Sequence, residues 1–412
     1  MSVVTSESKR FVIHRAEELS STPNPLAAQY SRFRVAERLL LTGHSHQAWP
    51  DRGFEGQKQA WLDAAEMADE KWDRAFAKAD RVRLGFARLL GDKPERIALA
   101  QNTHELVLCF LSALQLRERP RVVTTDGEFH TIRRQLDRLA EEGLEVVKVP
   151  AHPAATVGER LVSQIDDRAA AVMVSSVFFQ TGHIAGGLGE VMQACEREGV
   201  ELLVDAYHSL NVVPFRLADE GVEDAFVVGG GYKYCQLGEG NCFLRVPPGR
   251  ETMRPIVTGW FSEFSALEAS GAGGPVAYGR GPDRFAGSTY DPTSHYRAAE
   301  VLDCFEEWGL TSELLREVNQ RQVGLLAERF DALDADPADI DRDRSVDLSQ
   351  IGGFLALRTP HAAELCAALR DRGISTDYRE DLLRLGPAPY LSEQQVSSAA
   401  ATLGEVIGEV AP

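Results

Sequence analysis

Cysteine is scarce in this chain, and long apolar runs are missing. The six cysteines among 412 residues form no CxxC pair, which excludes a disulfide scaffold and argues against a zinc site made of closely spaced thiolates. No stretch approaches the roughly 18 apolar residues that cross a membrane. The first twenty residues lack the apolar segment of a secretory signal. We therefore expect a cytoplasmic protein that holds no metal and contacts no membrane.

Positive charge is also in deficit. Lysine and arginine number 44 against 62 aspartates and glutamates, which gives a net charge of −18. Nucleic acids and anionic membrane surfaces require basic partners, so neither is expected to bind. A local group of donors can still hold a small anion inside an acidic protein. The 44% of apolar and 26% of charged residues are typical of a globular fold and exclude extended disorder.

Short Val-rich runs alternate with helical stretches through the middle of the chain. This alternation indicates an α/β fold whose large domain has a mostly parallel central sheet flanked by helices. A Gly- and Pro-rich segment follows over 250–290, and the remaining pattern is typical of a smaller α+β domain. We predict an N-terminal arm over 1–45, a large domain over 46–290 and a C-terminal domain over 291–412. The expected strands of the large domain cover 121–126, 145–150, 169–177, 201–206, 224–231 and 241–246.

Lysine is rare even among the basic residues, since only seven of the 44 are lysine. One of them, Lys233, lies in GGGYKYCQLGEG directly after an expected strand, without an acidic neighbour within five residues. An amine can lose its proton and form an imine, whereas a guanidinium cannot. An apolar pocket lined by cations lowers the pKa of a lysine enough for this chemistry. The alternative is an ordinary surface lysine on a Gly-rich hairpin.

A carboxylate ends the preceding expected strand. Asp205 closes ELLVDA, and His208 follows in DAYHSL. Open α/β sheets bind ligands at the carboxyl ends of their strands, where a buried aspartate needs a cation as its partner. The protonated ring nitrogen of pyridoxal phosphate is such a cation. The alternative is that Asp205 only caps the next turn. The combination of Asp205 with Lys233 favours the cofactor.

Two further segments would complete a cofactor site. In QNTHELV, Thr103 is the expected N-cap of a helix that opens at His104, and free amides at a helix start bind phosphate. A helix cap without a ligand explains this segment equally well. Phe129, in TDGEFHT, would stack on an aromatic ring or belong to the core.

The segment VDAYHSLNVVPFRLADEGVEDAFVVGGGYKY resembles the signature region of kynureninases. These belong to the class V aminotransferase group of the fold-type I superfamily of pyridoxal-phosphate-dependent enzymes. The resemblance extends over roughly 95–390 and includes SSVFFQTGHIAG, PIVTGWF and LLRLGPAPY, whereas the first ninety residues match loosely. It implies the fold of that superfamily and pyridoxal 5′-phosphate as the cofactor.

The resemblance also implies roles for single residues around the cofactor. Lys233 would hold the cofactor covalently, and Asp205 would pair with the pyridine nitrogen. His208 would lie close to the ring and support Asp205 or the phenolic oxygen, and Phe129 would stack on the ring.

The phosphate and the substrate would be held by other segments. Tyr232, Thr103 and the amide of His104 would contact the phosphate. Arg384, in LLRLGPAPY, would bind the α-carboxylate of the substrate through a bidentate fork. The alternative for Arg384 is a solvated arginine on an edge strand.

A second subunit is implied as well. Trp260, in TGWF, would reach the phosphate of the neighbouring subunit, with Ser288 or Thr289 beside it. We therefore expect a homodimer with shared active sites, joined through the Gly-rich segment over 250–290.

Two segments depart from the family pattern. STYDPTS replaces an Asn-Pro-Pro pattern near the second phosphate contact, so the individual roles of Ser288, Thr289 and Tyr290 stay open. EKWDRAFA contains no histidine where kynureninases present one to the aromatic ketone of their substrate, which indicates a substrate other than kynurenine. His44 and His46, in LTGHSHQAWP, would approach the substrate pocket instead or cap a turn.

The expected activity is that of a pyridoxal-phosphate-dependent enzyme on a small α-amino acid, with kynureninase-like hydrolase or lyase cleavage toward the side chain. A class V aminotransferase that releases a keto acid uses the same residues and is the first alternative. A cysteine desulfurase is less favoured, because residues 310–365 contain no cysteine. A catalytically silent binding or regulatory module would be insensitive to Lys233→Ala.

Overall fold

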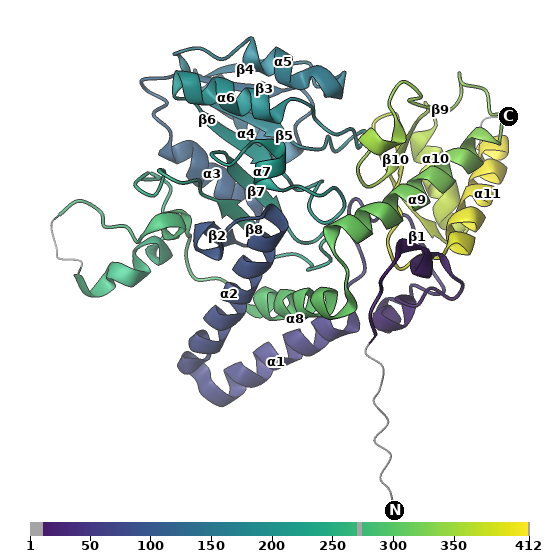
Figure 1. Ribbon diagram of the computed structural model, residues 1–412, viewed down its shortest axis with the longest axis horizontal. Helices are drawn as coiled ribbons and strands as arrows, with labels where there is room; N and C mark the ends of the chain where they lie inside the picture. Colours follow the sequence, from purple (N-terminus) through teal and green to yellow (C-terminus); the bar gives the residue numbers. More distant parts are fainter. Residues whose placement is uncertain (1–10, 270–273, 411–412) are drawn as a thin grey trace, which may run out of the picture.

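The computed structural model describes residues 11–269 and 274–410 (Figure 1). The start of the predicted N-terminal arm, four residues of the Gly-rich segment and the last two residues of the predicted C-terminal domain lie outside the described residues. No helix within the described ranges is both long and apolar enough to cross a bilayer. The cytoplasmic location stays a prediction. All six cysteines are buried and none forms a disulfide.

A seven-stranded sheet lies at the centre of the larger part of the molecule, in the order β2-β8-β7-β6-β5-β3-β4. The five strands from β7 to β4 in this order are parallel. At the other edge, β8 is antiparallel to both of its neighbours, β7 and β2. The predicted mostly parallel α/β sheet is therefore confirmed. The strands are β2 (Ile97–Ala100), β3 (Arg121–Thr125), β4 (Glu145–Val149), β5 (Ala169–Ser175), β6 (Glu201–Asp205), β7 (Phe226–Gly230) and β8 (Cys242–Arg245).

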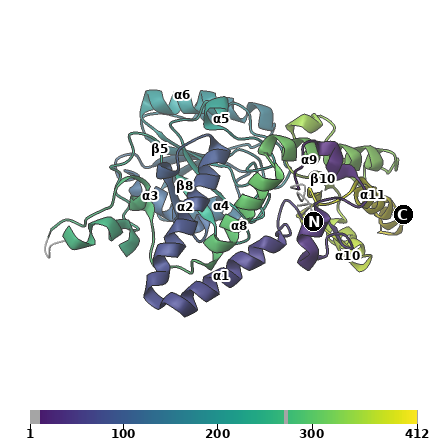
Figure 2. The ribbon, with the colours of Figure 1, turned by 60° about the horizontal axis from the view of Figure 1, so that its bottom comes forward.

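Alternate residues of the central strands serve two apolar clusters on opposite faces of the sheet. In β5, Ala171 and Met173 belong to the cluster with residues of α3 and α4, whereas Val172 and Val174 belong to the cluster with residues of α5 and α6. Figure 2 shows α5 and α6 together on one side of β5. Burial on both faces explains the continuous apolar runs of these strands. The covering helices are α3 (Thr103–Ala113), α4 (His130–Glu141), α5 (Val157–Val162), α6 (Leu188–Glu198) and the short α7 (Leu217–Glu220).

Three helices form a group next to the sheet. α8 (Thr293–Trp308) packs on both α1 (Asp51–Met67) and α2 (Lys71–Leu90), as Figures 1 and 2 show. Gly56 allows the close approach, since a Cβ there would lie 2.5 Å from the carbonyl oxygen of Tyr296. The predicted border at 290/291 stays a prediction. Because α8 packs on α1 and α2 of the large domain, we propose that this domain extends to the end of α8.

The smaller part contains a four-stranded antiparallel sheet in the order β12-β13-β10-β9. A segment near the N-terminus joins it, because β1 (Leu39–Leu40) pairs in parallel with β11 (Ile374–Ser375). This pairing brings residues 41–48 between the two parts of the molecule, close to the ends of the large-sheet strands. The other elements are β9 (Asp341–Arg342), β10 (Leu355–Arg358), β12 (Asp377–Arg379), β13 (Leu382–Leu385), α9 (Ser312–Asp331), α10 (Ala362–Asp371) and α11 (Glu393–Val410).

Candidate active site

The parallel strands end at a cavity of about 440 Å³. Asp205 is the last residue of β6, and Lys233 follows β7, which is the neighbour of β6 in the sheet. The structure thus brings together the two side chains on which the cofactor prediction depends. Five more of the predicted site residues line the same cavity: Thr103, His104, Phe129, His208 and Tyr232.

The amine of Lys233 is buried among aromatic rings. The side chain is 6% exposed. Its Nζ lies 5.5 Å from the ring centroids of Phe129 and Tyr207 and 5.3 Å from that of Tyr232. The alternative of a surface lysine on a hairpin is therefore wrong. The electron-rich faces of these rings attract an ammonium, but they provide much less solvation than water does.

Lys233 is held by one backbone and one side-chain contact. Its Nζ lies 3.0 Å from Nε2 of His208 and donates a hydrogen bond to the carbonyl oxygen of His44 at 3.3 Å. Burial and the guanidinium of Arg384 lower the pKa of Lys233 to about 7, while the charge of Asp205 acts in the opposite direction. A large fraction of the amine is therefore neutral, and nucleophilic, at physiological pH.

Asp205 is a carboxylate that lacks a closely bound cation. Its Oδ1 accepts the backbone N–H of Tyr207 at 2.9 Å, and Oδ2 has no hydrogen-bond partner within the described residues. Burial raises the pKa of Asp205 to about 6, although the Tyr207 hydrogen bond and Lys233 act against it. A protonated ring nitrogen placed here would supply the missing partner, so this residue fits pyridoxal phosphate.

A second buried acid, Glu128, lies behind Asp205 and was not among the predicted site residues. It accepts hydrogen bonds from the hydroxyls of Thr125 and Ser175, both at 2.6 Å, and from the amide of Ser175 at 3.2 Å. Burial raises the pKa of Glu128 to about 7 against these hydrogen bonds, and Asp205 adds to the rise. Ser175 is the register partner of Asp205 across β5 and β6. The signal in the sequence was an acid directly before Phe129.

The start of α3 differs from the prediction by one residue. Asn102 is the N-cap, and its side-chain oxygen accepts the amide N–H of Glu105 at 3.0 Å. The predicted cap, Thr103, is wrong because asparagine caps helices as well as threonine does, and at position 102 its oxygen reaches the third helical residue. Thr103 is thus not needed as a cap, and it lines the cavity with His104.

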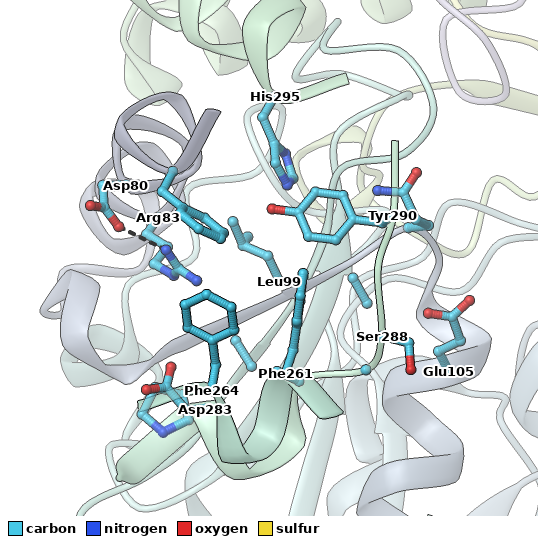
Figure 3. Close-up of a pocket in the computed structure, with 17 residues that line it drawn as sticks. Asp80, Arg83, Leu99, Glu105, Phe261, Phe264, Asp283, Ser288, Tyr290 and His295 are labelled. Atoms are coloured by element: carbon cyan, nitrogen blue, oxygen red, sulfur yellow. Dashed lines mark hydrogen bonds and ion pairs between the residues drawn. The ribbon is translucent and has the colours of Figure 1, made fainter. Parts of the chain in front are cut away.

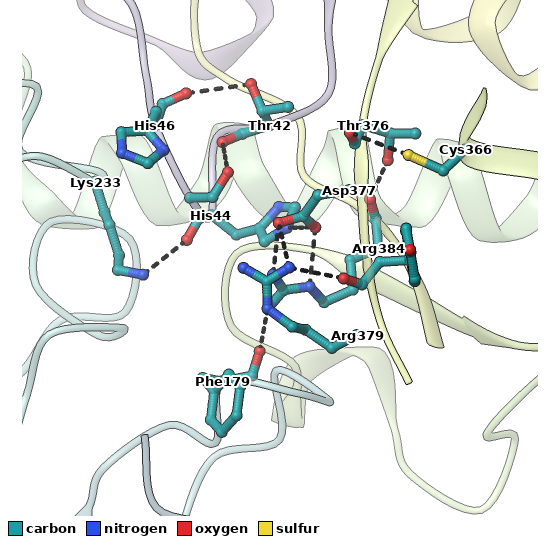
Figure 4. Close-up of polar contacts among 12 residues, drawn as sticks. Thr42, His44, His46, Phe179, Lys233, Cys366, Thr376, Asp377, Arg379 and Arg384 are labelled. Atoms are coloured by element: carbon teal, nitrogen blue, oxygen red, sulfur yellow. Dashed lines mark hydrogen bonds and ion pairs between the residues drawn. The ribbon is translucent and has the colours of Figure 1, made fainter. Parts of the chain in front are cut away.

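Arg384 lies in β13 of the small sheet, is 2% exposed and does not line the cavity around Lys233. Its Nε and Nη2 donate to Oδ1 and Oδ2 of Asp377 at 3.0 and 2.6 Å, and its Nη1 donates to the carbonyl oxygen of Phe179 at 2.6 Å (Figure 4). The alternative of a solvated edge arginine is therefore wrong. Asp377 was not predicted as part of the site.

The two predicted histidines near the substrate occupy different environments. His44 is fully buried, with Nε2 2.6 Å from Oδ1 of Asp377, and does not line the cavity around Lys233. His46 is exposed. Its ring stacks on Tyr232 with centroids 5.1 Å apart, and its Nε2 lies 3.7 Å from Glu239. Since Tyr232 and Glu239 line the cavity, His46 lies beside its rim.

The residues expected to serve a second subunit lie elsewhere. Nε1 of Trp260 donates to the hydroxyl of Thr289 at 3.1 Å. Ser288 and Tyr290 line a separate cavity of about 280 Å³ (Figure 3). Trp260, Ser288 and Thr289 do not line the cavity around Lys233 within this subunit. Trp72, from the segment that lacks the expected histidine, packs edge-on against Tyr290.

Comparison with known proteins agrees with this geometry. The model of the kynureninase C-terminal domain matches residues 320–403. The chain is 26% identical to the kynureninase of Deinococcus radiodurans over 405 residues, which are 94% of either protein. It is 22% identical to an uncharacterized aminotransferase of Bacillus subtilis over 347 residues, 83% of this chain and 87% of that protein.

The chain is therefore similar to kynureninases and to an aminotransferase over most of its length, and the likeness to kynureninases includes their C-terminal domain. Kynureninases and the aminotransferases of class V are pyridoxal-phosphate-dependent enzymes that act on amino acids. The predicted resemblance to kynureninases, the enzymatic character and the pyridoxal-phosphate cofactor are therefore confirmed.

Solved structures confirm the fold-type I architecture of this kynureninase-like chain. A cystine C–S lyase in complex with cysteine persulfide matches it with a TM-score of 0.79 at 17% identity, over 92% of this chain and 99% of that one. A cysteine desulfurase from Thermococcus onnurineus matches with a TM-score of 0.76 at 18% identity, over 96% of this chain and 99% of that one. At these identities the likeness concerns the fold and leaves the reaction open.

Proposed function

We propose that this kynureninase-like enzyme binds pyridoxal 5′-phosphate at Lys233 and cleaves the side chain of a small α-amino acid. One observation carries the proposal. A buried amine with a lowered pKa lies between a carboxylate on the adjacent strand end and a guanidinium on the second sheet. The amine matches the aldehyde of the cofactor, and the carboxylate matches its protonated ring nitrogen. The guanidinium matches the carboxylate of an amino acid.

The residues around the cavity fit the cofactor. Lys233 would hold it covalently, Asp205 would pair with its protonated ring nitrogen, and Phe129 would face its ring. His208 supports this fit, because its buried Nδ1 has no hydrogen-bond partner among residues 11–269 and 274–410 and is available to the cofactor or to Asp205. Three further polar groups of the cavity are available to the phosphate: the hydroxyls of Tyr232 and Thr103 and the amide of His104.

Two residues then act on the substrate. When bound, the cofactor accepts the electron pair that is released at the substrate α-carbon. Lys233, displaced by the substrate amine, takes the α-proton, and a pKa near 7 suits this exchange at neutral pH. Arg384 holds the α-carboxylate. In kynureninase-like hydrolysis, water supplies a hydroxyl to Cγ and a proton to Cβ, so that alanine and a carboxylic acid leave.

Transamination is the second candidate, and the Bacillus subtilis relative favours it. It requires the same Lys233, Asp205 and Arg384, and its products are a keto acid and the aminated cofactor. A cysteine desulfurase is less favoured, because its nucleophile is a thiolate. Cys242 lines the cavity, but burial raises its pKa to about 12, and the other cysteines are buried as well.

We further propose a homodimer with shared active sites. Trp260, Ser288 and Thr289 do not line the cavity around Lys233 of their own subunit. The side chain of Trp260 is 44% exposed, as expected for a residue that a second copy covers. A neighbouring subunit would therefore bring these side chains to the phosphate, as the family resemblance implies.

Product analysis tests the proposed reaction. The holoenzyme is incubated with L-kynurenine, L-cystine and a set of other L-amino acids, and products are separated by chromatography. We expect at least one amino acid to lose its side chain, and Lys233→Ala to abolish the reaction. If the product is a keto acid that retains the whole side chain, the reaction is transamination and not cleavage. Equal behaviour of wild type and Lys233→Ala would indicate a silent binding module.

A further inference from the structure

A buried ion pair and a histidine connect the small sheet to the amine of Lys233. Asp377 accepts hydrogen bonds from Nε and Nη2 of Arg384 and from Nε2 of His44, the last at 2.6 Å (Figure 4). The carbonyl oxygen of the same histidine accepts the hydrogen bond from Nζ of Lys233. One residue, His44, therefore touches both the amine and the carboxylate partner of the guanidinium.

The hydrogen bonds of Arg384 leave the end of its guanidinium available. A guanidinium has five N–H donors. Asp377 and Phe179 use three of them, one each on Nε, Nη2 and Nη1. One N–H remains on each terminal nitrogen without a hydrogen-bond partner among the described residues, and a carboxylate can accept from both terminal nitrogens as a fork. Asp377 thus binds the guanidinium through Nε and Nη2 and leaves one N–H on each terminal nitrogen for a ligand.

The protonation states support this arrangement. Burial raises the pKa of Asp377, but the hydrogen bonds and charges of His44 and Arg384 outweigh burial and hold the pKa well below its ordinary value. Burial lowers the pKa of His44 to about 4, so its ring is neutral at pH 7. Since a carboxylate only accepts hydrogen bonds, Nε2 of His44 carries the proton.

The backbone fixes the position of His44. The amide of Gly43 donates to the carbonyl oxygen of Gly386, and the amide of Gly386 donates to the carbonyl oxygen of Leu41, both at 2.8 Å. The ring lies against Phe354, with centroids 4.6 Å apart. A Cβ at position 386 would lie 2.1 Å from Nδ1 of His44, so this ring position requires glycine there.

We propose that Asp377 and His44 are positioning residues. They hold Arg384 so that its two terminal N–H groups receive the α-carboxylate, and His44 sets the distance from this fork to the amine of Lys233. This inference rests on the proposed function, because it takes an α-amino acid as the ligand. It predicts that both residues contribute to recognition of the carboxylate and not to recognition of the amine.

Two probes that differ only in the carboxylate test the inference. L-Alanine and ethylamine are titrated into the holoenzyme, and binding is followed by the absorbance of the bound cofactor and by the melting temperature. We expect the wild type to bind L-alanine at least about tenfold more tightly than ethylamine. His44→Leu and Asp377→Asn should lower this ratio by about tenfold or more, with the ethylamine constant unchanged.

Two further variants serve as controls. His44→Gln keeps an N–H donor and should retain the ratio within about threefold. Asp381→Asn removes an exposed acid that pairs with Arg358 in the same sheet, and it should change neither constant. The melting temperature of each variant shows whether the fold is intact.

Each contrary outcome has a separate meaning. Equal weakening of both probes in His44→Leu and Asp377→Asn would overturn the inference, because the residues would then be merely structural. A higher ratio in Asp377→Asn would also overturn it, because Asp377 would then compete with the ligand. Equal affinity of the wild type for both probes would exclude Arg384 as the carboxylate site. A wild type that responds to neither probe would contradict the proposed function itself.

Discussion

The amine of Lys233 combines burial with a neighbouring guanidinium, and both lower its pKa. Its position and that of Asp205 at the strand ends could be predicted, because Asp205 ends one apolar run and Lys233 closely follows the next, which is a local property of the sequence. Asp377 and Glu128 could not be predicted in this way. Asp377 belongs to the site through its contacts with Arg384 and His44, and the contact with His44 depends on the pairing of β1 with β11, which are far apart in sequence.

Removal of the Arg384 guanidinium should raise the pKa of Lys233. In the cofactor-free protein, the rate of capture of pyridoxal phosphate by Lys233 should rise with pH through about 7, because the neutral amine reacts. In Arg384→Gln we expect the midpoint to move upward by about one pH unit or more, since the remaining charge of Asp377 acts in the same direction. Arg358→Gln, in the same sheet, is the control. An unchanged midpoint would exclude this electrostatic coupling.

Glu128 should make the stability of the protein depend on pH. Its pKa in the folded state, about 7, is raised from 4.5, so its stabilising contribution is fully present below about pH 4.5 and is lost as the pH rises through about 7. Glu128→Gln has no such loss. The free energy of unfolding of the variant, relative to that of the wild type, should therefore rise by up to about 3 kcal/mol between pH 5 and pH 8. Urea unfolding at both pH values measures this, and a constant difference would contradict it.

At the scale of elements, periodicity located most helices and parallel strands because their apolar faces are continuous. The strand β2 was not predicted, since its four residues, IALA, are too short to show a period. The start of α3 was misplaced because several residues in QNTHELV are suitable caps, and only the observed hydrogen bond to Glu105 distinguishes them. The pairing of β1 with β11 joins residues far apart in sequence, which no local pattern predicts.

At the N-terminus of α3, the helix cap and the proposed cofactor contact belong to different residues, Asn102 and Thr103, and can be tested separately. Asn102→Ala should lower the free energy of unfolding of the cofactor-free protein by about 1 kcal/mol, because the amide of Glu105 loses its partner. Thr103→Val should leave this stability within about 0.5 kcal/mol and weaken cofactor binding instead. Chemical unfolding and cofactor titration of both variants measure the two effects. The reverse pattern would restore Thr103 as the cap.

At the scale of the whole molecule, the candidate site is assembled from three parts of the chain. The large sheet supplies Lys233 and Asp205, the small sheet supplies Arg384, and a segment near the N-terminus supplies His44 between them. The arrangement of strands within each sheet agrees with the predicted α/β fold. The ion pair of Asp377 and Arg384 joins register partners on β12 and β13 of the small sheet. Its place near Lys233 depends on how the two sheets meet, which is a matter of tertiary packing, and for that reason Asp377 was not predicted as part of the site.

Mixing of inactive subunits tests the shared dimer. A homodimer has a mass of about 90 kDa, twice the 45.3 kDa of the chain. Lys233→Ala and Trp260→Ala should each be inactive, but a mixed dimer contains one site with both native residues. Reassociation of equal amounts should therefore restore about a quarter of the wild-type activity. A monomeric mass, or no recovery after mixing, would contradict shared sites.

Near-visible absorbance with borohydride reduction tests the role of Lys233 most directly. The purified wild type, after reconstitution with pyridoxal 5′-phosphate where needed, should carry a chromophore that borohydride fixes to the protein. Peptide mapping should place the label on Lys233, and Lys233→Ala should lose it. Lys148→Ala, which changes a half-exposed lysine paired with Asp137, should keep it. A wild type that stays colourless with added cofactor, or a label on another lysine, would contradict the assignment of Lys233.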